Sequence, residues 1–175
     1  DPENPIGPYG YTKWIGEKVS YMYSKLHQLP ITVIRLYFPY GPEQKAGIFP
    51  LIHHSVEKGD QLTIKRDGSP RFNPVHIDDL VSAIAKVIES CKGCRTYNVC
   101  GDDALSFLEI VRHFEKECGR EANLIYSDED EGDLLGDNSL IKEELGWKPQ
   151  KKLVKEIGFL VRGSKEEGKS RGESG

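Results

Sequence analysis

The sequence has no long apolar run and no excess of basic residues. No stretch approaches the roughly 18 consecutive apolar residues that span a bilayer, and the first residues lack the charged and then apolar layout of a secretion signal. The 24 Lys and Arg are outnumbered by 28 Asp and Glu, so the net charge is -4, and no dense basic face marks a nucleic-acid-binding surface. These absences argue against membrane and nucleic-acid partners, and they favour a cytoplasmic location.

Metal-binding patterns are also scarce. The four cysteines include a C-K-G-C pair, Cys91 and Cys94, but no second C-x-x-C or H-x-x-x-H follows at zinc-finger spacing. The neighbours His53 and His54 do not face one ligand well, because adjacent helix positions point in different directions. The acidic run 128–133 lacks the ligand spacing of a calcium loop. We therefore predict reduced thiols, packed or solvated histidines, a solvated acidic loop and no metal site.

What the sequence does contain is the composition of a globular protein. Hydrophobic residues make up 37 % and charged residues 30 % of the 175 positions, which suits one ordinary domain or a large part of a two-lobed one. The sequence begins at Asp1 rather than at a methionine, close to the start of a predicted helix. We therefore expect the beginning of the chain to lie elsewhere.

The N-terminal part of the sequence predicts a helix followed by a buried strand. Apolar residues at helical spacing cover 9–29, and Pro30 ends this helix. The β-branched run 31–36 is typical of a strand in a parallel sheet. The turn-rich loop 37–42 follows at the carboxyl end of this strand, which is where ligands collect in open α/β sheets.

The rest of the sequence alternates helices with short strands. Helical periodicity predicts helices over 48–58, 78–90, 106–118, 140–145 and 153–162. Strand-forming residues predict extended segments over 61–65, 71–77, 97–99 and 123–126. Ser106 and Glu109 form a capping box, and glycine stops three helices, at Gly59, Gly119 and Gly146. The tail 163–175 has no apolar residue to bury and is expected to be disordered.

One pair of residues carries a chemical prediction. Tyr9 and Lys13 stand four positions apart, so they share one face of the first helix. A nearby ammonium stabilises phenolate and so lowers a tyrosine pKa that is otherwise about 10. Such a tyrosine can act as an acid/base near neutral pH if a cleft and a substrate hydroxyl face it. On its own, this spacing is also that of ordinary surface helices.

The order of five segments is more specific than that pair. The segments are Y-G-Y-T-K at 9–13, R-L-Y-F-P-Y-G-P at 35–42, P-R-F-N-P-V-H-I-D-D-L-V at 70–81, Y-N-V at 97–99 and L-G-W-K-P at 145–149. In order and spacing the series resembles the C-terminal half of the extended short-chain dehydrogenase/reductases. These are the NAD-dependent epimerase/dehydratase family, which acts on nucleotide sugars, and the likeness is to its UDP-glucose 4-epimerase-like members. The resemblance covers roughly residues 4–160.

The resemblance implies an α/β fold, namely the C-terminal part of a Rossmann-type parallel sheet with a smaller α/β substrate lobe. Residues 1–162 would form this part of the epimerase/dehydratase domain. The sheet lobe would comprise about 9–36 and 78–99, and the substrate lobe about 43–77 and 104–160.

The same resemblance implies roles for particular residues. Tyr9 would exchange a proton with a sugar hydroxyl while hydride passes between the sugar carbon and nicotinamide. Lys13 would hold the nicotinamide ribose and lower the pKa of Tyr9. Pro39, with the backbone around Tyr37 and Phe38, would lie against the nicotinamide end of NAD or NADP.

Substrate recognition follows the family pattern in part. Arg71 matches the arginine that commonly meets the substrate diphosphate, and a nucleotide sugar is the expected substrate. Many relatives have Arg-x-x-Asn where this sequence has Arg35 and Phe38, so an aromatic replaces the asparagine that contacts substrate. Many also have an arginine shortly before Gly-Asp, where this sequence has Asp130 and Glu131, and a carboxylate cannot clamp a diphosphate.

Two family features are absent from the sequence. The glycine-rich G-x-x-G-x-x-G turn, which brings backbone close to the dinucleotide pyrophosphate, does not occur, and the catalytic Ser or Thr would fall before Asp1. Two hypotheses follow. In the first, the chain is the C-terminal portion of an NAD(P)-dependent sugar-nucleotide epimerase, dehydratase or reductase and is inactive alone. In the second, it is a non-catalytic member or standalone fragment that acts as a binding or interaction module.

The helix after Tyr9 also bears on assembly. Relatives often dimerise by packing this helix into a four-helix bundle, so a homodimer is expected. Trp14, Tyr21 and Met22 could supply the contact face, or they could pack within the monomer.

Overall fold

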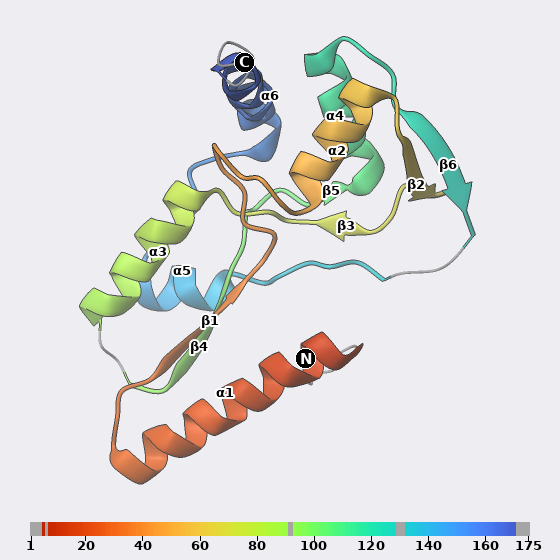
Figure 1. The fold of residues 1–175 in the computed structure, drawn as a ribbon. Helices are drawn as coiled ribbons and strands as arrows, with labels where there is room; N and C mark the ends of the chain where they lie inside the picture. Colours follow the sequence, from red (N-terminus) through yellow and green to blue (C-terminus); the bar gives the residue numbers. More distant parts are fainter. Residues whose placement is uncertain (1–4, 6, 91–92, 129–131, 171–175) are drawn as a thin grey trace.

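The computed structural model describes residue 5 and residues 7–90, 93–128 and 132–170. Helices and strands alternate through most of them (Figure 1). The helices are α1 (Gly7–His27), α2 (Ile48–Lys58), α3 (Ile77–Ser90), α4 (Phe107–Cys118), α5 (Ser139–Leu145) and α6 (Leu153–Ser170). The strands are β1 (Thr32–Leu36), β2 (Gln61–Lys65), β3 (Arg71–Phe72), β4 (Arg95–Val99), β5 (Leu105–Ser106) and β6 (Asn123–Ser127). No helix among the described residues combines the length and the apolar character that crossing a membrane requires.

Pairs of strands organise the chain. β1 and β4 are parallel, from Thr32 opposite Arg95 to Leu36 opposite Val99, which confirms that the run 31–36 contributes a strand to a parallel sheet. β2 and β6 are also parallel, whereas β3 and β5 are antiparallel. α1 lies on one side of the β1–β4 pair, and α3 and α5 lie on the other (Figure 1). In the described part of the chain β4 is the one strand that pairs with β1, so the second edge of β1 stays open.

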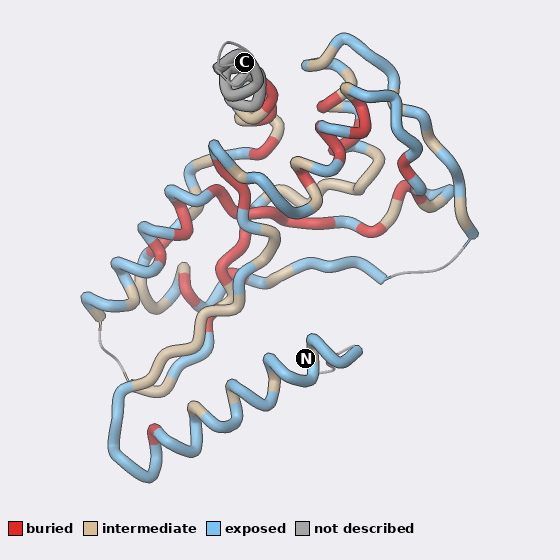
Figure 2. Tube along the Cα trace, viewed as in Figure 1, coloured by how far each residue is buried: buried red, intermediate tan, exposed pale blue. Residues whose placement is uncertain are grey.

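Buried side chains gather in two clusters. The sheet core packs around β4, α3 and α5, and its buried members are Val75, Leu80, Ala83, Tyr97, Val99, Ile141 and Trp147. The helical core packs mainly among α2, α4 and α6, and its buried members are Tyr40, Phe49, Ile52, Val56, Leu62, Phe72, Ile110, Val111, Phe114, Leu153, Ile157 and Val161. Figure 2 shows that most of α1 is exposed, in contrast to the buried trace at the centre of the molecule.

The position of α5 bears on the division into lobes, which stays a prediction. We predicted 104–160 as part of the substrate lobe, whereas Ile141 of α5 and Trp147 just after it are buried in the sheet core. Trp147 donates its indole N–H to Ser82 Oγ at 2.9 Å and to Asp79 O at 3.2 Å, both on α3. A buried indole needs a partner for its single donor, and α3 supplies it, so α5 is drawn onto the sheet.

The extended segment predicted over 71–77 is shorter in the structure. Only Arg71–Phe72 forms a strand. Pro74 follows and has no N–H to donate to a ladder. Val75 instead donates to Tyr37 O and accepts from the N–H of Tyr40, at 3.2 and 3.0 Å. These bonds tie the segment to the loop after β1 rather than to a neighbouring strand.

The last helix runs past its predicted end. We predicted it to stop near Arg162, whereas α6 continues to Ser170. The disorder of the tail 163–175 stays a prediction. The sequence of this segment is rich in Lys and Glu, which are good helix formers even without an apolar face. Residues 171–175 lie outside the described residues.

Helix ends follow the predicted capping residues. Ser106 Oγ accepts a hydrogen bond from the N–H of Glu109 at 3.1 Å, and Glu109 Oε2 accepts one from the N–H of Ser106 at 2.7 Å, which confirms the capping box. A glycine with a left-handed backbone follows each of α2, α4 and α5, namely Gly59, Gly119 and Gly146.

α1 is held largely by contacts within itself, since Ser24 is its one buried residue. Lysine side chains lie over aromatic rings four positions earlier in the helix, with Nζ between 4.6 and 5.3 Å from the ring centroids. The pairs are Lys13 over Tyr9, Lys18 over Trp14 and Lys25 over Tyr21. Cation–π contacts at this spacing favour the helical conformation, which explains how the helix forms with little support from the cores.

The phenol of Tyr97 predicts a loss of stability at alkaline pH. Burial, together with the hydrogen bond that Tyr97 donates to Glu144 Oε2 at 2.6 Å, raises the pKa of Tyr97 to about 12, against about 10 in an unfolded chain. The stabilisation is therefore fully present below pH 10 and is lost as the pH rises to 12. Relative to Tyr97→Phe, the native chain should lose up to about 3 kcal/mol of unfolding free energy across this window.

Urea unfolding of both chains at several pH values between 8 and 12 measures this difference. Because the phenylalanine variant cannot ionise at this position, the two stability curves should converge as the pH rises. Curves that stay parallel would show that Tyr97 does not titrate in this window.

Candidate active site

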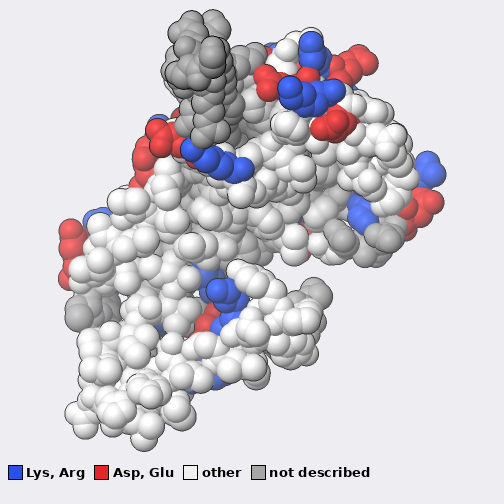
Figure 3. Space-filling model, in the orientation of Figure 1, with Lys and Arg blue, Asp and Glu red and all other residues white. Residues whose placement is uncertain are grey.

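A cleft separates the first turns of α1 from β1 and the loop that follows it. We call it the Tyr9 cleft. Its volume is about 560 Å³, and its lining includes Tyr9, Lys13, Glu17, Arg35 and Tyr37. Figure 3 shows a hollow beside α1 in which acidic and basic side chains lie together, whereas most of the surrounding surface of α1 carries no charge. The cleft therefore combines a few charged side chains with largely apolar walls and an open entrance.

Tyr9 and Lys13 meet on one face of α1 at this cleft. Lys13 Nζ lies 5.3 Å from the centroid of the Tyr9 ring. Tyr9 is 76 % exposed, so its phenol is accessible to a bound molecule. The arrangement places a proton-carrying phenol and a positive charge at the entrance of a cavity.

An ion pair that sequence reasoning missed joins α1 to β1. Arg35 donates through Nε and Nη2 to the two carboxylate oxygens of Glu17, at 2.8 and 2.5 Å, which is the bidentate geometry that guanidinium and carboxylate favour. The signal for Glu17 was present in the sequence, because Tyr9, Lys13 and Glu17 follow one another at four-residue spacing. Arg35 thus binds both oxygens of Glu17 and neutralises this carboxylate beside Lys13.

The loop after β1 carries three predicted cofactor-binding residues, which lie in different surroundings. Tyr37 lines the Tyr9 cleft, and burial raises the pKa of its phenol, so that the ring stays neutral. Phe38 has a φ of 45°, a rare conformation for a bulky residue, and its ring packs edge-on against Phe72 with centroids 4.5 Å apart. Pro39 is exposed. The structure thus brings Tyr37 to Tyr9 and Lys13, and turns the Phe38 ring toward the helical core.

Arg71 lies on β3 and is not among the residues that line the Tyr9 cleft. Its N–H donates to Asp133 Oδ1 at 2.9 Å, and its carbonyl accepts from the N–H of Leu134 at 2.9 Å. The residue is exposed, so the guanidinium is accessible while the backbone is fixed. Asp133, which we predicted to be part of a solvated acidic loop, therefore anchors β3.

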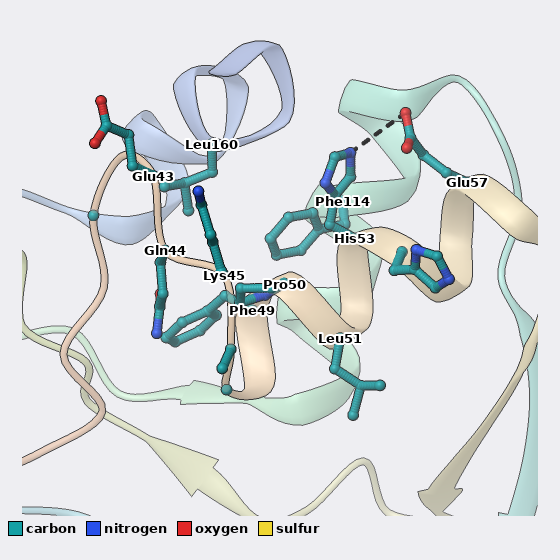
Figure 4. Close-up of a pocket in the computed structure, with 14 residues that line it drawn as sticks. Glu43, Gln44, Lys45, Phe49, Pro50, Leu51, His53, Glu57, Phe114 and Leu160 are labelled. Atoms are coloured by element: carbon teal, nitrogen blue, oxygen red, sulfur yellow. Dashed lines mark ion pairs between the residues drawn. The ribbon is translucent and has the colours of Figure 1, made fainter. Parts of the chain in front are cut away.

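A larger cavity of about 800 Å³ lies between α2, α4, α6 and the loop before α2 (Figure 4). His53 Nε2 lies 3.5 Å from Glu57 Oε1, and the His53 ring stacks on Phe114 with centroids 6.0 Å apart. His54 points elsewhere, 3.7 Å from Asp60. One histidine is packed and the other solvated, as the sequence predicted. Among the described residues, none of the predicted site residues lines this cavity. The Tyr9 cleft is therefore the candidate active site.

Metal ligands do not gather anywhere in the described part of the chain. There, no group of three His, Cys, Asp or Glu side chains could hold a metal ion. Cys94 and Cys100 carry free thiols, and burial raises the pKa of Cys100 to about 11, which makes that thiol unreactive at neutral pH. Cys91, Asp130 and Glu131 lie outside the described residues.

Comparison of the sequence with known proteins identifies relatives. The sequence model of the NAD dependent epimerase/dehydratase family matches residues 1–100. The chain is 31 % identical over 168 residues to a Bacillus subtilis (strain 168) protein named an uncharacterized UDP-glucose epimerase, covering 90 % of this chain and 52 % of that protein. It is 29 % identical over 167 residues to the UDP-glucose 4-epimerase of Mycolicibacterium smegmatis, covering 91 % and 53 %. The chain thus spans about half the length of the curated relatives it matches.

Solved structures share the fold. The UDP-glucuronic acid 4-epimerase of Bacillus cereus, in complex with UDP-glucuronic acid and NAD, matches with a TM-score of 0.83 at 26 % identity, covering 93 % of this chain and 54 % of that chain. The dTDP-glucose 4,6-dehydratase of Bacillus anthracis, in complex with NAD, matches with a TM-score of 0.83 at 23 % identity, covering 95 % and 54 %. These matches confirm the predicted Rossmann-type α/β fold.

The family match and the cleft rest on the same residues. The matched segment 1–100 is more than half of the 175 residues, and it contains the Tyr9–Lys13 pair and the loop that carries Tyr37. Relatives of the family have been solved with NAD and with a nucleotide sugar bound. The chain belongs to the NAD-dependent epimerase/dehydratase family.

Proposed function

We propose that this chain is the C-terminal portion of an NAD(P)-dependent sugar-nucleotide epimerase/dehydratase in which Tyr9 is the acid/base. The observation that carries the proposal is that Tyr9, Lys13 and Tyr37 line one cleft, although they come from a helix and from the loop after a strand. A phenol, an ammonium and an aromatic wall around one space suit proton transfer beside a planar cofactor ring.

The donor set of the cleft fits the nicotinamide end of NAD or NADP. Lys13 offers N–H donors to ribose hydroxyls, and Tyr37 offers a half-buried, neutral aromatic face. When bound, the cofactor supplies the transfer of hydride to and from a sugar carbon. The 175 residues contain no glycine-rich turn for the pyrophosphate, so the cleft serves one end of the cofactor.

The proton step falls to Tyr9. Its exposed oxygen takes the proton of a sugar hydroxyl or returns it. The Lys13 ammonium stands 5.3 Å from the ring centroid, so the proton would be transferred beside a positive charge. The Glu17–Arg35 pair supports this arrangement, because it neutralises the carboxylate that stands one helical turn beyond Lys13.

A nucleotide sugar is the substrate class we propose. Arg71 would meet its diphosphate, since an accessible guanidinium on a fixed backbone suits a bidentate contact with phosphate oxygens. Phe38 does not provide a polar contact in place of the asparagine of many relatives, because its ring packs on Phe72. Phosphate recognition on this side of the molecule therefore depends on Arg71.

The test uses the protein extended upstream in its genomic reading frame. The purified protein is supplied with NAD and UDP-glucose, and the appearance of a C4 epimer or a 4-keto product is followed by chromatography. Turnover of a nucleotide sugar supports the proposal. Absence of both turnover and NAD binding would favour the alternative hypothesis, in which the chain is a non-catalytic binding or interaction module.

We also propose a homodimer through α1. The side of α1 turned away from Glu17 and Ser24 carries an exposed apolar stripe at spacings of four, four, three and four residues, made of Tyr11, Ile15, Val19, Met22 and Leu26. Exposed stripes of this kind mark helix-packing faces. The stripe differs from the face suggested by the sequence, because Trp14 lines the Tyr9 cleft and Tyr21 pairs with Lys25.

Val19→Glu in the extended protein is expected to weaken dimerisation at least about tenfold, because a charge on a packed helix face loses its hydration. Sedimentation velocity across a range of concentrations measures the effect. Ser20→Glu is the matched control, since it adds the same charge at the next position and off the stripe. Equal dissociation of both variants, or of neither, would contradict an interface along this stripe.

A further inference from the structure

Gly136 packs against the ring of Tyr37, a residue that lines the Tyr9 cleft. It lies in the segment 132–138, which leads from β6 to α5. A Cβ at Gly136 would lie 2.7, 2.8 and 2.9 Å from Cε2, Cδ2 and Cζ of Tyr37, closer than van der Waals contact allows. Gly136 does not have a left-handed backbone. Glycine is therefore needed here for space rather than for conformation.

The backbone at Gly136 is held in place. The buried Asn73 donates through Nδ2 to Gly136 O at 2.7 Å and accepts from Gly136 N–H at Oδ1 at 2.9 Å. The thiol of Cys100 donates to the same carbonyl at 3.3 Å. The Asn73 amide thus bonds both the N–H and the C=O of Gly136, as a residue on a neighbouring strand would. Moving this backbone away from an added Cβ would break these bonds.

The backbone of Tyr37, on the other side of the contact, is held by two hydrogen bonds. Its N–H donates to Val99 O and its carbonyl accepts from the N–H of Val75, both at 3.2 Å. Its ring lines the Tyr9 cleft and can turn about its side-chain bonds. A Cβ at Gly136 would therefore be accommodated by rotation of the Tyr37 ring.

We propose that Gly136 is a positioning residue, which sets through its missing Cβ where the Tyr37 ring stands in the Tyr9 cleft. The inference rests on the proposed function, because that proposal places the nicotinamide end of the cofactor against this ring. It makes the segment 132–138, which lies far along the sequence from Tyr9, part of the machinery that shapes the space in front of Tyr9 and Lys13.

Gly136→Ala in the extended protein is expected to raise the KM for NAD about fivefold to tenfold, with kcat changed less than about twofold. A displaced ring alters the surface that meets the cofactor, whereas Tyr9 and Lys13 stay in place on α1. Loss of folded protein would lower kcat and leave KM unchanged, so the split between the two constants separates positioning from structural damage.

Two further variants sharpen the test. Gly132→Ala is the matched control, since a Cβ there meets nothing within 4 Å, and it should leave both constants unchanged. Tyr37→Ala removes the ring, so adding Gly136→Ala on that background should have no further effect on KM. An unchanged KM in Gly136→Ala, or an additive increase in the double variant, would overturn the proposal.

The ring position can also be read without turnover. In the 175-residue chain labelled with 13C-tyrosine, the aromatic resonance of Tyr37 is assigned by its loss in Tyr37→Phe. Gly136→Ala should shift this resonance and Gly132→Ala should not. A shift in a protein without NAD-dependent turnover would contradict the proposed function and uphold the placement of Tyr37 by Gly136. A resonance that does not move would contradict the placement itself.

Discussion

Replacing Tyr9 with phenylalanine in the extended protein is expected to lower kcat about 10³-fold, because general acid/base groups contribute factors of about 10² to 10⁴. The change removes the oxygen that would carry the proton and leaves the ring under the Lys13 ammonium. Tyr9 is 76 % exposed, so no core packing is lost and the melting temperature should not move. The measurement is kcat with a nucleotide sugar, alongside a thermal melt.

Tyr11 offers the matched control for this variant. It lies two positions further along α1, is 52 % exposed and points to the apolar stripe rather than into the Tyr9 cleft. Tyr11→Phe should therefore keep the parent turnover. Equal losses in the two variants, or undiminished turnover in Tyr9→Phe, would exclude Tyr9 as the acid/base.

Asp79→Ala is expected to lower the free energy of unfolding by about 3 kcal/mol, because hydrogen bonds to a charged group contribute about 1.5 to 3 kcal/mol each. Asp79 is 4 % exposed. Its Oδ1 accepts from the N–H of Gln150 at 3.0 Å, and its Oδ2 accepts from the N–H of Lys151 at 2.9 Å. The alanine variant loses both bonds, and with them the tie between α3 and the segment that leads into α6.

Guanidinium unfolding followed by tryptophan fluorescence measures this effect, since Trp147 is buried close to Asp79. Asp78→Ala is the control, because the Asp78 side chain is 68 % exposed and its contacts with His76 and Lys151 are long, at 3.5 and 4.0 Å. Exposed pairs contribute less than about 1 kcal/mol. Equal losses of unfolding free energy in the two variants would show that the two backbone hydrogen bonds to Asp79 do not account for the effect.

Local signals in the sequence were enough to predict much of the fold. The β-branched run of β1, the helix periodicity of α2, and the capping box of Ser106 and Glu109 each depend on residues within one or two turns of the chain. Gly59, Gly119 and Gly146 end helices for the same local reason, since glycine takes a left-handed backbone at little cost.

Long-range contacts account for what the sequence could not predict. The packing of α5 against α3 could not be predicted, because it depends on Trp147, whose indole N–H finds its partners on α3. The spacing of apolar residues along the sequence does not reveal a contact between two distant segments. α6 extends past its predicted end because its residues favour a helix even where the apolar periodicity used for the prediction stops.

The candidate site also contains contacts that the sequence predicts and contacts that it does not. Tyr9 and Lys13 could be predicted, because residues four apart share a helix face whatever the tertiary structure. The partner of Glu17 could not, because Arg35 reaches it from the next element of the chain. The contact between Gly136 and Tyr37 was also out of reach, since it depends on the path of a segment that Asn73 holds.

Hydrogen exchange at the open edge of β1 would report whether another strand pairs with it. In a parallel pair, alternate residues direct their N–H and C=O groups to opposite edges, and within the described residues only β4 takes one set of them. The other N–H groups of Thr32–Leu36 face outward, where deuterium from solvent replaces their hydrogens quickly. When another strand pairs with this edge, the same amides become slow to exchange. Deuterium uptake along these five residues therefore distinguishes a bare sheet edge from a completed one.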